Sequence, residues 1–295
     1  MPSTSSAFTK VLNNPAFCTL AADLQSTLRP FRAAGEKVVF VPTMGALHAG
    51  HQALINAARG ISSQVWVSVF VNPTQFNQPS DLAAYPRQLD ADRRLAAEAG
   101  AAGVFAPDFQ EVYPNFQPDT VPEVDYGLLT STLEGQQRPG HFNGVVQVVR
   151  RLFELVDPDV AMFGEKDYQQ FAVVSELVRR EKLSVEIVGV PTVRAADGLA
   201  LSSRNVRLSE DARRSALRLS EEIKAVACAP NPSLAASQAF VRLSADPLIA
   251  PEYLSVVAAD TFENWTPELS TAARVLVAAQ VGGVRLIDNI AVRPA

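Results

Sequence analysis

Short, continuously apolar runs alternate with helical patterns through the first two thirds of the chain, and this alternation limits the fold more than any other feature. The first run, Val38–Val41, contains no polar residue, as is typical of a strand buried on both faces. It stops at Pro42, and beyond a glycine-containing loop Leu54, Ile55 and Ala58 recur at helical spacing. Parallel sheets are built from such strand, loop and helix units.

Four further apolar runs repeat this unit. They are expected to form strands at 65–71, 103–106, 160–163 and 185–190, with helices at 87–99, from 141 to about 155 and after residue 167. We therefore predict an α/β fold around a sheet of about five parallel strands. The stretch 107–140 is rich in proline and glycine, so it is expected to be mostly irregular and to form a lid or a wall.

The pattern changes after Pro191. Residues 192–203 are expected to form two short strands around a turn at Asp197 and Gly198, followed by amphipathic helices near 209–228 and 233–245. Three strand-like segments at 253–259, 274–280 and 284–289 complete the chain, the last two joined by a Gly-Gly turn. We therefore expect an α/β domain at 1–191 and a smaller α+β domain at 192–295 that forms a hinged lid.

Composition and charge exclude several classes of protein. A chain of 295 residues that is 47% hydrophobic can bury a core, which excludes a disordered tail. The net charge of −5 offers no basic surface for nucleic acid or an anionic membrane, so neither is expected as a partner. The two cysteines, Cys18 and Cys228, are far apart in sequence, which indicates neither a disulfide framework nor a zinc site.

The sequence also shows no pattern typical of a targeting signal. Residues 1–10 lack the basic and apolar regions of a secretory signal, and no apolar run approaches the ~20 residues that a membrane span needs. We therefore expect a cytoplasmic protein without a membrane partner.

The strongest local motif is the loop after the first strand. It carries His48 and His51 at a predicted helix N-terminus, with Gly50 between them. A helix N-terminus has free N–H groups and a positive dipole end, so two histidines three residues apart can meet a phosphate there. An isolated pair fits helix caps or metal ligands equally well. Its position directly after a buried strand favours nucleotide phosphate binding.

Two other loops place cations near strand ends. Gly164 and Lys166 follow a predicted strand and precede a helix, so the lysine can meet phosphate oxygens. Ser202, Ser203 and Arg204 follow the predicted hairpin and offer donors to negative charge that shifts in a transition state. Each motif alone also fits a structural interpretation, a solvated helix cap for the first and a polar linker for the second.

Other polar residues are weaker candidates. Gln170 is expected to face the strand ends, and Arg138 and His141 could line the same cavity or be structural. Asp90 and Asp92 could reach Mg²⁺ bound to nucleotide phosphates, although solvated side chains are the expected state at these positions. The chain has no P-loop, no dinucleotide fingerprint and no hydrolase nucleophile elbow.

Taken together, five segments resemble the pantothenate synthetase family. They are residues 42–51, 70–76, 138–142, 163–170 and 197–205, which read PTMGALHAGH, FVNPTQF, RPGHF, FGEKDYQQ and DGLALSSRN. The match runs in order from about residue 38 to 209 and continues weakly to Asn289. This family is similar to other nucleotidyl transferases that carry an HxGH loop, which implies a Rossmann-like parallel sheet in the first domain.

The resemblance implies an ATP-dependent ligase that joins (R)-pantoate to β-alanine through a pantoyl adenylate and releases AMP and pyrophosphate. It further implies a homodimer that takes Mg²⁺ with its substrate ATP. The implied catalytic residues are His51, His48, Lys166 and Arg204. Pantoate binding is implied for Gln75 and Gln170, and β-alanine binding for Gln75. The implied ATP-binding residues are Met44, Gly45, Ala46, Leu47, His48, Ala49, Gly50, His51, Gly164, Glu165, Lys166, Asp167, Val193, Leu201, Ser202, Ser203 and Arg204.

Two departures from the family pattern leave points open. The loop of Ser202, Ser203 and Arg204 has no lysine, so Lys166 and Arg204 must supply the cations. Ala91 stands where family members often have a carboxylate, which leaves the Mg²⁺ contact open between Asp90, Asp92 and ATP alone. The rival interpretations are another HxGH adenylyl transferase, with a phosphorylated or RNA substrate, and an inert nucleotide-binding regulator. The acidic charge disfavours RNA, and the presence of His51, Lys166 and Arg204 disfavours the regulator.

Overall fold

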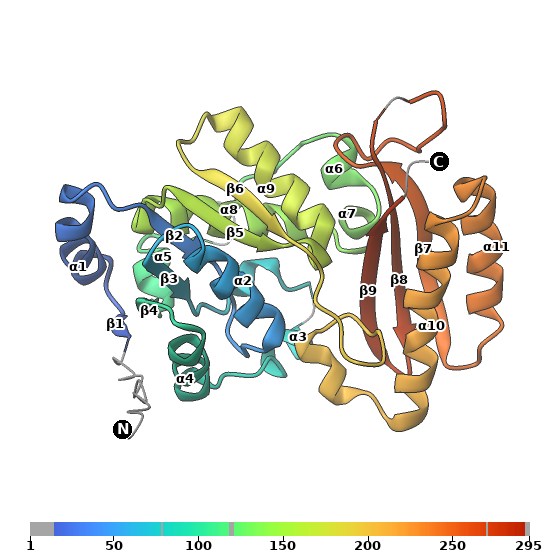
Figure 1. The fold of residues 1–295 in the computed structure, drawn as a ribbon, viewed down its shortest axis with the longest axis horizontal. Coiled ribbons are helices and arrows are strands. Elements are labelled where there is room, and N and C mark those ends of the chain that lie inside the picture. Colours follow the sequence, from blue (N-terminus) through green and yellow to red (C-terminus); the bar gives the residue numbers. More distant parts are fainter. Residues whose placement is uncertain (1–14, 78, 118–120, 270, 293–295) are drawn as a thin grey trace, which may run out of the picture.

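The structure, a computed structural model, describes residues 15–77, 79–117, 121–269 and 271–292. The segment 1–10, on which the expectation of a missing secretory signal depends, lies outside the described residues. Figure 1 shows a parallel sheet flanked by helices, and beside it a second sheet covered by two helices.

The first sheet has six parallel strands in the order β1-β4-β3-β2-β5-β6. They are β1 (Ala16–Cys18), β2 (Val38–Val41), β3 (Gln64–Ser68), β4 (Gly103–Phe105), β5 (Val160–Gly164) and β6 (Glu186–Val190). The α/β fold class is therefore confirmed, whereas the predicted strand number of about five is too low. The missed strand, β1, has only three residues, so its apolar run is too short to indicate a strand.

Helices cover both faces of this sheet because alternate strand residues point to opposite sides. Val38 and Phe40 pack with α1 (Ala21–Ala33), α8 (His141–Val156) and α9 (Tyr168–Glu181). Val39 and Val41 pack on the other face with α2 (Ala49–Arg59) and α4 (Leu89–Ala99). The continuously apolar sequence of β2 is explained by these two cores.

The strand order places two loops side by side. From β2 the chain moves outward to β3 and β4 on one side, and later to β5 and β6 on the other. In open parallel sheets ligands bind at the carboxyl ends of the strands where the order reverses. Here that point lies between β2 and β5, which end in the His48 loop and the Lys166 turn.

The described residues of the proline-rich stretch after β4 contain three helices of one turn each, α5 (Phe109–Val112), α6 (Leu128–Ser131) and α7 (Glu134–Gln137). Other short elements among the described residues of the first part are α3 (Pro79–Ala83), η1 (Pro73–Gln75) and η3 (Glu165–Asp167). Apart from its three helical turns the stretch is irregular where it is described, as expected. Glu134 and Arg138 from this stretch line the cleft described below, so it forms a wall.

The second part is an antiparallel sheet in the order β7-β8-β9, formed by β7 (Ile249–Ala258), β8 (Ala273–Val281) and β9 (Val284–Ala291). Helices α10 (Glu210–Ala227) and α11 (Pro232–Ser244) cover one face. Gly282 and Gly283 join β8 to β9 with φ angles of 54° and 79°, the left-handed conformation that a two-residue hairpin of this type requires.

One expectation for this part is wrong. Residues 192–203 do not form two strands, because their antiparallel pairing is limited to a single bridge, Arg194 with Ala200, flanked by two backbone hydrogen bonds of 2.8 and 2.9 Å. The tight turn at Gly198 is present, with φ at 95°. A loop rather than a hairpin therefore leads to η4 (Ser203–Arg207).

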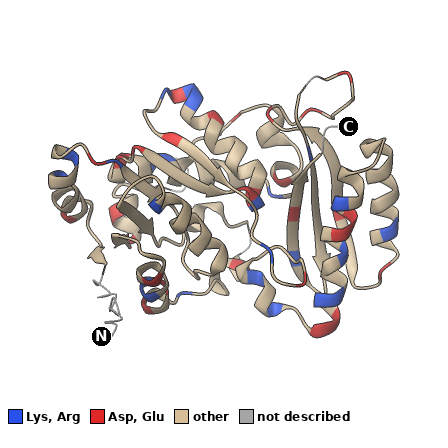
Figure 2. Cartoon of the chain, viewed as in Figure 1, with Lys and Arg blue, Asp and Glu red and all other residues tan. Residues whose placement is uncertain are grey.

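The two parts share an apolar contact. Tyr253, Val257, Leu276 and Ala278 lie on the face of the second sheet that α10 and α11 leave free, and they join the core of the first part. Acidic and basic residues occur on the same outer helices, as on α4 and α10 (Figure 2). Within the described chain, none of the helices combines the length and the apolarity needed to cross a bilayer.

Candidate active site

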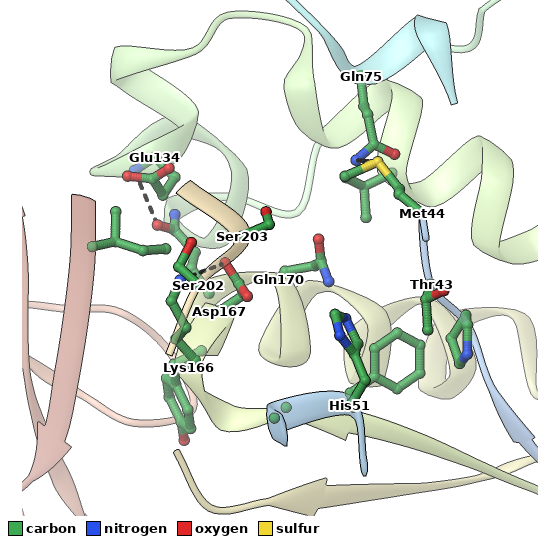
Figure 3. A pocket seen from close by; sticks show the side chains of 18 of the residues that line it. Thr43, Met44, His51, Gln75, Glu134, Lys166, Asp167, Gln170, Ser202 and Ser203 are labelled. Carbon is green, nitrogen blue, oxygen red and sulfur yellow. Dashed lines mark hydrogen bonds and ion pairs between the residues drawn. The ribbon is translucent and has the colours of Figure 1, made fainter. Parts of the chain in front are cut away.

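A cleft lies where the carboxyl ends of β2, β5 and β6 meet the second sheet. One part is a cavity of about 270 Å³, and an adjoining cavity of about 660 Å³ shares Lys166, Asp167, Ser202 and Arg204 with it. Figure 3 shows Lys166 and the two serines on one side of this space, His51, Met44 and Gln75 on the other, and Gln170 between them.

The histidine loop is shaped by contacts of its backbone. Gly45 and Ala46 both have positive φ, at 81° and 52°, and the buried carboxylate of Asp92 accepts hydrogen bonds from the N–H groups of Ala46 (3.2 Å) and Leu47 (2.7 Å). Asp92 is only 2% exposed. The expectation that it is solvated is therefore wrong, because it stabilises a left-handed turn more than forty residues away in sequence.

Hydrogen bonds fix the tautomer of both loop histidines. The Nδ1 atom of His48 accepts from the N–H of Gly50 (3.1 Å), and the Nδ1 atom of His51 accepts from the N–H of His48 (3.2 Å). The two rings thus form a reciprocal cap of α2. Since a backbone N–H can only donate, each ring must carry its proton on Nε2. Both histidines can therefore donate from Nε2.

Burial keeps these donors neutral. Burial and the neighbouring His48 lower the pKa of His51 to about 3, and burial and the charge of Lys166 lower the pKa of His48. The cleft of the ligand-free protein therefore presents neutral N–H groups at neutral pH. Such donors are oriented before an anion arrives, so the rings need not reorganise when phosphate binds.

Cations stand opposite the histidines. Lys166 lies on the short turn after β5, with its Nζ atom 3.7 Å from Asp167 Oδ1. Ser202 caps η4 by accepting from the N–H of Arg204 (3.2 Å). Arg204 donates to Asp81 Oδ2 (3.2 Å) on α3, a contact that sequence reasoning missed because it joins residues 123 positions apart.

The amide of Gln75 lies against the histidine loop. Its Nε2 atom donates to Met44 Sδ (3.3 Å) and its Oε1 atom accepts from Asn72 (3.1 Å), so both ends of the amide are oriented. Gln170 comes from the first turn of α9 and points into the same space (Figure 3). Asn72 is only 1% exposed and was missed as a site residue, although it lies in a segment that carries the resemblance.

The structure gives Arg138 and His141 a common partner. Arg138 approaches the backbone O of Gln75 (3.3 Å), and its Nη1 atom lies 3.0 Å from His141 Nε2. Because arginine only donates, His141 accepts at Nε2 and donates from Nδ1 to the same O of Gln75 (3.0 Å). The two residues thus hold the backbone of the Gln75 loop.

Most of the residues proposed from the sequence come together here. Met44, His48, Gly50, His51, Gln75, Gly164, Lys166, Asp167, Gln170, Val193, Leu201, Ser202, Ser203 and Arg204 line the cleft. Gly45, Ala46, Leu47, Ala49 and Glu165 are not among the lining residues; Gly45 packs against Asp92, and Glu165 pairs with Arg274. No group of three His, Cys, Asp or Glu side chains in the described ranges is arranged to hold a metal ion.

We expect acid to destabilise the fold through the buried histidines. Burial and Arg138 lower the pKa of His141 to about 4, and that of His51 is about 3. Below pH ~6.5 the unfolded chain therefore binds protons that the folded chain excludes, so stability is complete above this pH and falls as the pH drops. Between pH 7 and pH 5 the loss should be about 2 kcal/mol for each histidine, measured by urea unfolding.

His141→Asn is the matched control for this pH effect. Asparagine can still donate to the O of Gln75 but does not titrate, so the loss between pH 7 and pH 5 should shrink by about 2 kcal/mol. Equal unfolding free energies of the unmodified protein at the two pH values would contradict the neutral state of both rings.

Comparison with known proteins gives consistent matches. The family model for pantoate-beta-alanine ligase matches residues 16–291. The chain is similar to a pantothenate synthetase of Bacteroides thetaiotaomicron, with 48% identity over 274 residues that cover 91% of this chain and 95% of the relative. The crystal structure of pantothenate synthetase from Thermus thermophilus superposes with a TM-score of 0.84 at 44% identity, covering 95% of this chain and all of that one.

A third match concerns a structure with bound ligands. The pantoate-beta-alanine ligase of Francisella tularensis, described as complexed with beta-gamma ATP and beta-alanine, has a TM-score of 0.80 at 30% identity. It covers 95% of this chain and 99% of that one.

Proposed function

The chain belongs to the pantoate-beta-alanine ligase family, whose activity condenses pantoate with β-alanine using ATP, and we propose that here the reaction runs through a pantoyl adenylate formed in the cleft described above. One observation carries this proposal. Two neutral Nε2–H donors on the His48 loop face Lys166 and the Ser202 to Arg204 loop across a single cavity, which suits the phosphate chain of ATP.

In the first step a pantoate carboxylate oxygen attacks the α-phosphorus of ATP, and the bond to the leaving pyrophosphate breaks. The protein supplies no covalent group to this step, so its contribution is to position the reactants and to stabilise charge. His51 and His48 donate to the α-phosphate region, near the N-terminus of α2. Lys166 and Arg204, with Ser202 and Ser203, stabilise the negative charge that builds up on pyrophosphate.

Gln75 and Gln170 would hold pantoate with its carboxylate near the α-phosphorus, since both amides reach the cavity. In the second step the neutral amine of β-alanine attacks the acyl carbon, a C–N bond forms, AMP leaves and the amine loses a proton. Gln75 would also contact β-alanine. The bound β-alanine and ATP analogue of the Francisella tularensis relative support binding of these substrates here.

The remaining assignments concern ATP and the assembly. Mg²⁺ would arrive with ATP, and the enzyme would act as a cytoplasmic homodimer in which Cys18 and Cys228 stay reduced. The division into domains 1–191 and 192–295 is supported by the end of β6 at Val190. The further ATP contacts that we propose come from Met44, Gly45, Ala46, Leu47, Ala49, Gly50, Gly164, Glu165, Asp167, Val193 and Leu201.

Pantoate labelled with ¹⁸O in its carboxylate tests the adenylate directly. Attack on the α-phosphorus followed by amide formation should leave one labelled oxygen in AMP, and pantoate alone with ATP should support exchange of pyrophosphate into ATP. Release of ADP, or AMP free of label, would contradict the intermediate. Absence of any product from folded protein would contradict the activity itself.

A further inference from the structure

The turn that carries Lys166 is held by a residue from the opposite end of the chain. The preceding Gly164 provides no side-chain cap for η3. Instead the Nδ2 atom of Asn289, on β9, donates to the backbone O of Glu165 and to that of Lys166, each at 2.8 Å. Asn289 is 4% exposed, so water cannot easily replace these bonds.

The orientation of the Asn289 amide follows from its other neighbour. Arg274 donates from Nη1 to Asn289 Oδ1 (2.6 Å) and from Nη2 to Glu165 Oε2 (2.9 Å). Its guanidinium also lies 3.6 Å from the ring centroid of Tyr168. Because arginine can only donate, the amide oxygen must face Arg274, and both amide hydrogens are left for the two carbonyls.

Asp288, the residue before Asn289, holds the loop that leads to Arg204. The carboxylate of Asp288 is 5% exposed and accepts two hydrogen bonds from Arg194, at 2.6 and 2.9 Å. Arg194 lies in the loop 192–203, next to Val193, whose backbone O accepts from the N–H of Leu201 (2.9 Å). That loop continues directly into Ser202, Ser203 and Arg204. Neighbouring side chains of a strand point to opposite sides, so β9 can reach both loops.

We propose that Asn289 is a positioning residue for Lys166 and that the pair Asp288 and Asn289 sets the spacing between Lys166 and the Ser202 to Arg204 loop. The inference rests on the proposed function, in which Lys166 stabilises the leaving pyrophosphate. The lysine side chain is long and flexible, so the place of its charge depends on where its backbone is held. A shift of about 1 Å in a catalytic group can lower a rate by about 10²-fold.

Asn289→Leu tests this role, because leucine is close in size but has no donor. The rate of pyrophosphate exchange with pantoate should fall about 10- to 100-fold. The decisive measurement repeats the substitution in a Lys166→Met background, where no ammonium is left to position. There Asn289→Leu should change the residual rate by less than about threefold, since coupled residues are not additive.

A control variant distinguishes the loss of Lys166 positioning from a general loss of stability. Asn231→Ala removes the cap of α11, in which Asn231 accepts from the N–H of Leu234 (3.0 Å), far from the cleft, and should leave exchange within about twofold in either background. Should Asn289→Leu not fold, Arg274→Met releases the amide oxygen and should show a smaller loss with the same non-additivity.

The outcomes separate the two hypotheses. Equal fold losses from Asn289→Leu with and without Lys166, or no loss at all, would overturn the positioning role while leaving the function of Lys166 intact. Unchanged turnover of Lys166→Met would instead remove Lys166 from the proposed function, and the positioning role with it.

Discussion

Replacing His51 by asparagine is expected to lower kcat about 10²- to 10³-fold, which corresponds to about 2.7–4 kcal/mol of lost transition-state stabilisation. The asparagine Oδ1 atom can still accept from the N–H of His48, so the cap of α2 is kept. Only the Nε2–H donor at the far side of the ring is lost. Pyrophosphate exchange and steady-state AMP release both measure this effect, and both should fall together.

His51→Gln is the matched variant for this experiment. A glutamine amide can place a donor near the position of Nε2, so it should recover part of the lost rate, whereas His51→Ala should resemble the asparagine variant. Turnover of His51→Asn within threefold of the unmodified protein would show that the ring serves only as a cap. That result would move the catalytic donor to another residue.

The second large effect concerns stability. Glu134→Gln is expected to lower the free energy of unfolding by about 1.5–3 kcal/mol, because it weakens the charge-assisted hydrogen bonds of a buried carboxylate while Arg285 keeps its pair with Glu252. Glu134 is 7% exposed and accepts from Arg285 at 2.6 and 2.8 Å and from the hydroxyl of Tyr253 at 2.7 Å. Burial alone would raise its pKa, but the hydrogen bonds and charge of Arg285 lower the pKa to about 2.

These contacts join α7 of the first part to β7 and β9 of the second, so their loss should also weaken the walls of the cleft. Urea unfolding at pH 7 measures the effect. Glu154→Gln is the control, since its exposed pair with Arg151 should contribute less than about 1 kcal/mol. Equal losses for the two variants would show that burial of the Glu134 carboxylate adds nothing to its pairing.

Local sequence patterns determined much of the first part of the molecule. The apolar runs predicted five of its six strands, because the strands of a parallel sheet covered by helices are mostly apolar. The same patterns placed the His48 loop and the Lys166 turn after strands. Since parallel strands share one carboxyl edge, these motifs had to lie at the same edge of the sheet.

Other features depended on contacts that no local pattern encodes. The three-residue strand β1 exists through pairing with β4, and the loop 192–203 forms one bridge instead of two strands. Asp92 was taken for a solvated residue because its position on α4 gave no sign of the loop it holds. Its burial follows from the packing of α4 against α2, which is decided by the strand order.

The sequence by itself therefore determined the order of most strands and helices and the identity of most side chains proposed for the cleft. The tertiary structure alone decided how these side chains are held: His141 on the O of Gln75, Arg204 on Asp81, and the Lys166 turn on Asn289. The physical reason is the separation along the sequence over which each kind of interaction acts. Periodicity and turn chemistry act over a few residues, whereas these hydrogen bonds join residues 66 to 123 positions apart and exist only once distant elements have packed together.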